Sequence, residues 1–228
     1  MTIKKKLGTV LFCGRKDCKH SDKIKNYLKK NSKKLHYFES KKRGERLNKK
    51  FTKIKFDYIF SFRSLCIIRN NILKKTVKAI NFHPGPPEYR GIGCVNYALY
   101  ENTKSYGCTA HFIEKKIDSG KIINVKKFKV NINDTIESVL TKTNRLMFRQ
   151  AIFIIKKIIN NKNIINIWIK KSNNIKWSKK IKNSEFLDKF YEIKKNDSKN
   201  IFLKKIRATY TRNYKPYIII HNKKFILE

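Results

Sequence analysis

Long apolar runs are absent from this chain of 228 residues. A helix needs about 18 uncharged apolar residues to span a bilayer, and the rich stretch from Ala151 to Ile159 is interrupted by Lys156 and Lys157. The sequence therefore predicts a soluble protein that does not associate with membranes. A hydrophobic fraction of 40% is still enough to build a core, which excludes disorder over most of the chain.

Cysteine is scarce, and the five cysteines do not form the paired framework that staples small secreted domains. The apolar segment Leu7–Gly14 follows basic residues, but it is as short as a signal peptide can be and lacks a small-residue cleavage site. We therefore predict a cytoplasmic location.

Paired metal-ligand spacings are also missing. Cys13 and Cys18 lie near a histidine, and so do Cys94 and Cys108, but neither group has the Cys-x-x-Cys spacing of a structural zinc site. We expect no metal.

Acidic residues are few: 16 Asp and Glu stand against 56 Lys and Arg, which gives a formal net charge of +40. Such a charge is typical of nucleic-acid binders. However, lysine is spread from Lys4 to Lys224 without one basic block. An AT-rich genome would be expected to encode many surface lysines in any protein, without a function for the charge. Both interpretations stay open, and the charge favours anionic substrates in general.

Short apolar segments alternate with helical ones over the first 160 residues, which implies parallel strands joined by right-handed crossovers. We expect an α/β fold, a Rossmann-like mostly parallel sheet with flanking helices. The expected strands are 7–13, 35–39, 56–62, 76–82, 107–113 and 121–130, and the expected helices are 22–30, 67–75, 94–102 and 134–159.

The composition becomes more monotonous after residue 160. We predict a catalytic domain over 1–160 and a small α+β appendage over 161–228 that ends in a β-hairpin around His221–Lys223. Exposed apolar strands often pair between chains, so a homodimer is possible. The other expected elements of the appendage are strands at 164–169 and 175–178 and helices at 185–191 and 198–207.

Proline and glycine, rare elsewhere, are concentrated between Ala79 and Lys121, which holds three of the four prolines and five of the eight glycines. Asn81 and His83 stand at the end of an expected strand, where open α/β sheets bind ligands, and Asp118 lies in an expected turn. An amide, an imidazole and a carboxylate suit proton transfer beside a developing oxyanion. From residue type alone, a structural histidine is the commoner alternative.

The run Asn81-Phe82-His83-Pro84-Gly85-Pro86-Pro87-Glu88-Tyr89-Arg90-Gly91-Ile92-Gly93, followed by Ile117-Asp118-Ser119-Gly120, resembles the signature of the 10-formyltetrahydrofolate-dependent formyltransferases. The resemblance covers residues 7 to about 155. It implies transfer of a formyl group from the folate to a primary amine. His83 would stabilise the oxyanion or take the proton of the amine, Asn81 would bond the formyl oxygen, and Asp118 would orient His83.

The resemblance also implies two binding regions. The pterin of 10-formyltetrahydrofolate would lie against two segments, mainly through backbone groups, although core packing is the alternative for Leu65 and Cys66. The acceptor would contact the proline- and glycine-rich loop, although Arg90 could equally be a surface charge. The predicted cofactor-binding residues are Phe62, Ser64, Leu65, Cys66, Ile113 and Ile117, and the predicted substrate-binding residues are Pro84, Gly85, Tyr89, Arg90 and Gly91.

Members of this family differ in the amine that accepts the formyl group. The segment after the first strand has one glycine, Gly14, which argues against the phosphate loop of glycinamide ribonucleotide enzymes, and the short tail argues against methionyl-tRNA enzymes. The continuation from Ile92 to Tyr100 resembles the sugar N-formyltransferases. We therefore expect formylation of a nucleotide-linked amino sugar of the 4-amino-4,6-dideoxyhexose type, in surface polysaccharide or O-antigen synthesis. Methionyl-tRNA formyltransferase and a non-enzymatic nucleic-acid-binding protein remain the alternatives.

Overall fold

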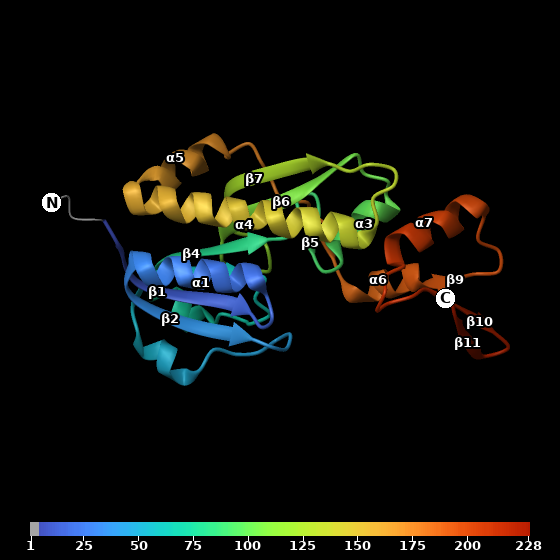
Figure 1. Cartoon of the computed structure of the whole chain (residues 1–228), viewed down its shortest axis with the longest axis horizontal. Coiled ribbons are helices and arrows are strands. Elements are labelled where there is room, and N and C mark those ends of the chain that lie inside the picture. Colours follow the sequence, from blue (N-terminus) through green and yellow to red (C-terminus); the bar gives the residue numbers. More distant parts are fainter. Residues whose placement is uncertain (1–4) are drawn as a thin grey trace.

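The computed structural model of the protein describes residues 5–228. Residues 1–4, with which the predicted catalytic domain begins, lie outside the described residues. The chain forms a body built on a large sheet and, at the end remote from the N-terminus, a smaller lobe (Figure 1). No helix within the described range is long and apolar enough to cross a membrane.

The sheet of the body has, within residues 5–228, six strands in the order β2-β1-β3-β4-β6-β7. The first four strands of the chain run parallel, and β6 and β7 are antiparallel to their neighbours. The predicted α/β fold with a mostly parallel sheet is confirmed. The strands are β1 Leu7–Arg15, β2 Ser32–Ser40, β3 Phe56–Phe62, β4 Thr76–His83, β6 Ser105–Phe112 and β7 Ile122–Lys129.

Both faces of this sheet are covered at its centre, which explains why the central strands β1 and β3 are apolar over most of their length. In β1, Val10 and Phe12 point into one apolar cluster, while Leu11 and Cys13 point into another on the opposite face. Helices α1, α4 and α5 contribute to the first cluster, and η1 and α2 to the second. These helices are α1 Lys19–Asn31, α4 Ile136–Asn160, α5 Ile164–Lys171, η1 Lys49–Lys53 and α2 Asn70–Leu73.

Two predictions for the segment after residue 160 are wrong. The stretch expected as a strand over 164–169 is helix α5, because Ile165 and Ile169 lie one helical turn apart and both pack on the sheet. The stretch 175–178 has no regular structure.

Within the body, the expected helix over 67–75 is reduced to the four residues of α2. The domain boundary near residue 160 stays a prediction.

The lobe joins the body through helix α3, Cys94–Tyr100, which packs against α7. Its terminal hairpin is confirmed: β10 and β11 are antiparallel, and His221 and Asn222 between them have φ of 46° and 61°, as a type I′ turn requires. A short parallel pair, β5 Arg90–Gly91 with β8 Ile181–Lys182, lies at the junction. The remaining elements are α6 Ser184–Tyr191, β9 Glu192–Ile193, α7 Lys199–Thr209, β10 Tyr217–Ile220 and β11 Lys223–Ile226.

Candidate active site

The three predicted catalytic residues meet beside the end of β4. Asn81 and His83 are two residues apart on this strand and therefore point to the same face of the sheet. Asp118 comes from the turn after β6, with its backbone at φ 44°. Its Oδ2 atom is 3.4 Å from Nδ1 of His83, and Asn81 joins the group through a second histidine.

His83 is 4% exposed, and both of its ring nitrogens face acceptors. Nε2 lies 2.8 Å from the carbonyl oxygen of Tyr89, while Nδ1 faces Asp118. Burial lowers the pKa of His83, and this outweighs the opposite effect of the Asp118 carboxylate. The neutral ring has one N–H, so it can donate to either Tyr89 or Asp118 but not to both. The contact with Tyr89 is the shorter one, so Nε2–H donates to that carbonyl, and Nδ1 beside the Asp118 carboxylate is the nitrogen that can act as a base.

Asp118 is nine-tenths buried and remains ionised. Burial acts to raise its pKa, but His83, His111 and the backbone N–H of Gly91, which donates to Oδ2 at 3.1 Å, together hold the pKa at about 2. A carboxylate that keeps its charge beside a buried imidazole can stabilise the imidazolium form during a reaction.

Sequence patterns did not point to a fourth polar residue of this site, His111 on β6. Its Nδ1 donates to the carbonyl of Phe112 at 2.7 Å, so in the neutral ring Nε2 accepts from Nδ2 of Asn81 at 3.2 Å. The same Nε2 is 3.4 Å from Oδ1 of Asp118. His111 thereby links the amide to the carboxylate. Its position in an expected strand was visible, but its pairing opposite Asn81 was not, because strand order is a tertiary property.

Trp177 was missed as well. It lies in the irregular stretch after α5 and sets its indole against both imidazoles, with ring centroids 5.8 Å from His83 and 4.9 Å from His111. Its Nε1 donates to the carbonyl of Gly120 at 2.8 Å. The segment after residue 160 therefore contributes a side chain to this site.

The proline- and glycine-rich loop is fastened over the site by its backbone. The carbonyl of Pro84 accepts from the hydroxyl of Tyr106 and that of Gly85 from Thr109, both at 2.8 Å. Tyr89 is buried, and its hydroxyl donates to Glu101 at 2.7 Å, so its side chain turns toward the core while its carbonyl faces His83.

Arg90 and Gly91 tie this loop to two other segments. The Arg90 guanidinium donates to the carbonyls of Ile117 at 2.5 Å and Ser178 at 3.4 Å. Gly91 has φ 101°, and a Cβ atom there would lie 2.2 Å from the carbonyl oxygen of Lys182. The structure thus gives Arg90 two carbonyl partners, and contact of this loop with an acceptor stays a prediction.

The segments predicted to bind folate lie on the two sides of β4. Phe62 is fully buried at the end of β3, and Ser64 to Cys66 follow it. On the other side, the N–H of Ile113 donates to Ala79 of β4. Two of the predicted folate-binding residues differ in how accessible they are to a ligand. The N–H of Leu65 is bonded to Ser40 and its carbonyl to Gly44, so both backbone groups are engaged, whereas the side chain of Ile117 is 69% exposed.

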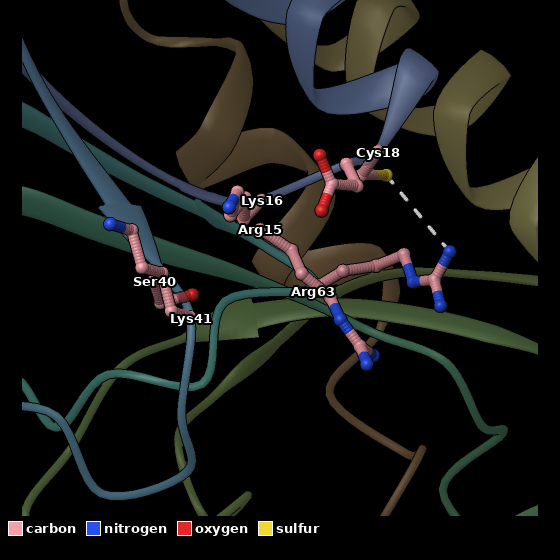
Figure 2. A pocket seen from close by; sticks show the side chains of 7 residues that line it. Arg15, Lys16, Cys18, Ser40, Lys41 and Arg63 are labelled. Carbon is pink, nitrogen blue, oxygen red and sulfur yellow. Dashed lines mark hydrogen bonds between the residues drawn. The ribbon is translucent and has the colours of Figure 1, made fainter.

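A basic cavity of about 340 Å³ lies beyond the carboxyl ends of β1, β2 and β3 (Figure 2). The chain passes from β1 to β2 on one side and returns to β3 on the other, and at such a switch point open sheets bind ligands. Four cationic side chains face one carboxylate there, which suits a phosphate-bearing ligand. The lining residues are Arg15, Lys16, Asp17, Cys18, Ser40, Lys41 and Arg63.

This cavity lies close to His83. Arg63 follows Phe62, and His83 follows Phe82, the partner of Phe62 in the adjacent strand. Strands are spaced by about 4.8 Å, so the site at β4 and the end of β1 are separated by roughly 10 Å along the sheet. Among residues 5–228, no group of three or more His, Cys, Asp or Glu is arranged to hold a metal ion.

A histidine that can act as a base, an ionised carboxylate beside it and an amide donor are the equipment of acyl transfer, in which a proton leaves the nucleophile while an oxyanion forms. The sequence model of the formyl transferase family matches residues 10–155, and the chain belongs to this family.

The comparisons with single proteins add detail. Over 93 residues the chain is 37% identical to the bifunctional polymyxin resistance protein ArnA of Wigglesworthia glossinidia brevipalpis, a match that covers 40% of this chain and 14% of that protein. The chain spans less than half the length of the first curated relatives that it matches.

Solved structures resemble the chain over nearly its whole length. A 4-N formyltransferase from Francisella tularensis has a TM-score of 0.70 at 20% identity, covering 97% of this chain and 96% of that one. An N-formyltransferase from Helicobacter canadensis, solved with folinic acid and dTDP-3-aminofucose, has a TM-score of 0.64 at 19% identity, with 96% and 86% covered. At these identities the likeness shows that the fold is shared.

Proposed function

We propose that the protein is an N-formyltransferase that moves the formyl group of 10-formyltetrahydrofolate to the primary amine of a nucleotide-linked amino sugar. The observation that carries this proposal is the contact of the His83–Asp118 pair with the Asn81–His111 pair at the end of β4. The folate would supply the formyl group on N10. Membership of the formyl transferase family and the ligands named for the Helicobacter protein support both substrates.

The residues divide the work of proton transfer and charge stabilisation. His83, whose Nε2–H donates to the carbonyl of Tyr89, takes the proton of the attacking amine at Nδ1, and the Asp118 carboxylate beside that nitrogen stabilises the resulting imidazolium. The imidazolium then gives the proton to N10 as tetrahydrofolate leaves. Asn81 has two N–H donors, one of which is engaged with His111. The second is available to the formyl oxygen as it gains negative charge. One such donor is typically worth about 10²–10³ in kcat.

The basic cavity supports a phosphate-bearing acceptor. It lies roughly 10 Å from the strand that holds His83, two strand spacings away, which is about the span of one hexose and a diphosphate. In this proposal Arg15 and Arg63 bind the diphosphate, and the amine of the sugar reaches His83. Folate would approach across the segments that flank β4, where the exposed Ile117 offers an apolar contact.

The first test is formyl transfer with purified protein, 10-formyltetrahydrofolate and dTDP-, GDP- or UDP-linked amino sugars, followed by mass spectrometry of the sugar. We expect a gain of one formyl group. His83→Ala and Asp118→Ala should each lower kcat by about 10²–10⁴ without unfolding. Turnover near that of the wild type in both variants would refute the mechanism.

The same assay tests the acceptor. Arg15→Ala and Arg63→Ala should raise the KM for the nucleotide sugar about tenfold and leave the KM for folate unchanged. Lys223→Ala, on the remote hairpin, is the matched control, since it removes a positive charge far from the cavity. If the KM values for the nucleotide sugar and for folate changed equally, the cavity would not be a specific binding site for the acceptor.

The position of the amine, 4-amino or otherwise, and the role in surface polysaccharide or O-antigen synthesis belong to this proposal as well. A second candidate acceptor is methionyl-tRNA, which the net charge of +40 favours. Competition between charged tRNA and an amino-sugar nucleotide distinguishes the two: the preferred acceptor should suppress formylation of the other.

A further inference from the structure

The connection from α5 to α6, residues 172–183, crosses the candidate site, and we name it the strap. Three of its hydrogen bonds to the body lie around the site: the N–H of Ser178 donates to Pro87 at 3.0 Å, the carbonyl of Lys182 accepts from Ile92 at 2.9 Å, and Trp177 donates to Gly120 at 2.8 Å. Two of these ties reach the proline- and glycine-rich loop, and the third reaches the turn that carries Asp118. The strap is therefore joined to the segments that position the catalytic groups.

Trp177 is the side chain that the strap turns inward. Its neighbours Ile175 and Lys176 are exposed, whereas Trp177 is half-buried and lies edge-to-face against His83 and His111, at interplanar angles of 76° and 85°. Edge-to-face pairs of rings are favourable and directional. The indole therefore constrains how both imidazoles are oriented.

The second tryptophan shows what a purely structural role looks like in this chain. Trp168 packs against the large apolar cluster of the sheet and stacks on Phe153, with ring centroids 5.8 Å apart. Trp177 is not a member of any apolar cluster within the described residues. Its ring partners there are the two histidines of the site.

We propose that Trp177 is a positioning residue of the active site, which holds the rings of His83 and His111 in place and keeps water away from the His83–Asp118 pair. The proposal rests on the proposed function only for its effect on turnover. The arrangement of the rings and the exclusion of water are properties of the protein without substrates.

Besides Trp177, several charged and titratable groups surround His83 and influence its pKa. Asp118 faces it from the turn after β6, His111 from β6, Arg90 from β5, and Cys94, with its Sγ atom 3.8 Å from Nε2, from α3. Each of these groups would stay when the indole is removed. Water would enter instead, and hydration favours the imidazolium form.

The test uses the whole chain without ligands, with the His83 Cε1–H signal followed by NMR against pH and assigned with His83→Asn. In Trp177→Ala we expect the midpoint of His83 to move to higher pH. In Trp177→Phe, which keeps an aromatic ring in place, it should stay close to that of the wild type. Trp168→Phe is the matched control and should leave the midpoint unchanged.

An unchanged His83 midpoint in folded Trp177→Ala would overturn the proposal. If that variant does not fold, Trp177→Val serves in its place, because it keeps an apolar side chain but is small enough to admit water and has no ring that could orient the imidazoles. Its His83 midpoint should also rise, and a midpoint equal to that of the wild type would likewise overturn the proposal.

The second arm measures formyl transfer. The acid limb of the profile of kcat/KM against pH should move in Trp177→Ala in the same direction as the NMR midpoint, and kcat should fall about tenfold to 100-fold. Partial rescue in Trp177→Phe supports positioning. If the wild type transfers no formyl group while the NMR midpoints shift as expected, the proposed function fails and the positioning by Trp177 stands.

Discussion

Three of the six non-glycine residues with positive φ in the described part of the chain lie at the candidate site and the basic cavity. Asp118 has φ 44°, and Asp17 and Arg63, which line the basic cavity, have 55° and 53°. Each such conformation costs of order 1–3 kcal/mol and persists only where the surroundings impose it. The other three, Asn102, His221 and Asn222, lie in turns away from the site, so positive φ is not confined to it.

At the residue scale, His83 and Asp118 make stability depend on pH. The pKa of His83 is lowered in the folded protein, so as the pH falls through about 6.5 the unfolded chain binds a proton that the folded chain does not. The free energy of unfolding should therefore decrease from pH 7 toward pH 5. The depressed pKa of Asp118, about 2, adds a further loss below about pH 4.

Urea denaturation at a series of pH values measures this effect. His83→Gln should flatten the curve between pH 7 and pH 5, because it removes the group whose protonation opposes folding. His20 and His36, whose pKa values burial also lowers, are present in both proteins, so the difference isolates His83. A variant curve parallel to that of the wild type would contradict the assignment.

At the scale of elements, the short β5–β8 pair holds the strap on the loop. Gly91 in β5 has a left-handed conformation, and an added Cβ would meet the backbone carbonyl of Lys182 in β8 at 2.2 Å. Gly91→Ala should therefore separate β5 from β8. We expect a loss of more than about 2 kcal/mol in stability and a strong fall in kcat, because the N–H of Gly91 also bonds Asp118.

Gly44→Ala is the matched control for this variant. Gly44 also has a positive φ, 82°, but an added Cβ meets nothing within 4 Å. It should cost only the strain of a left-handed alanine, about 1–2 kcal/mol, and leave kcat unchanged. Equal losses of stability in the two variants, measured by urea denaturation, would show that the β5–β8 contact contributes little.

At the scale of the whole molecule, the net charge of +40 makes salt a useful variable. A nucleotide sugar carries about two phosphate charges, so its KM should rise less than about tenfold between 50 and 200 mM salt, whereas an RNA acceptor bound through six or more phosphates would lose about 10³ or more in affinity. Kinetics at both salt concentrations decide between the acceptors.

The homodimer, in which a second copy of the chain would pair with the exposed terminal hairpin, stays a prediction.

That Asn81, His83 and Asp118 lie together was predictable, because the pattern that marks them is local in the sequence. Asn81 and His83 stand at the end of a strand that its apolar residues predict, and Asp118 stands in a turn that Gly120 predicts. The geometry of strand ends and the family resemblance together indicated these three residues. The α/β fold followed from the alternation of apolar segments, which depends on the short-range periods of helices and strands.

What the tertiary structure alone decided concerns partners that are distant along the chain. His111 faces Asn81 only because β6 pairs with β4, and Trp177 reaches the histidines only because the strap returns over the loop 94 residues after His83. The basic cavity needs three strands to be neighbours. Helix α5 was misjudged for the same reason: a short run of isoleucines fits a strand or a helix, and packing against the sheet chose the helix.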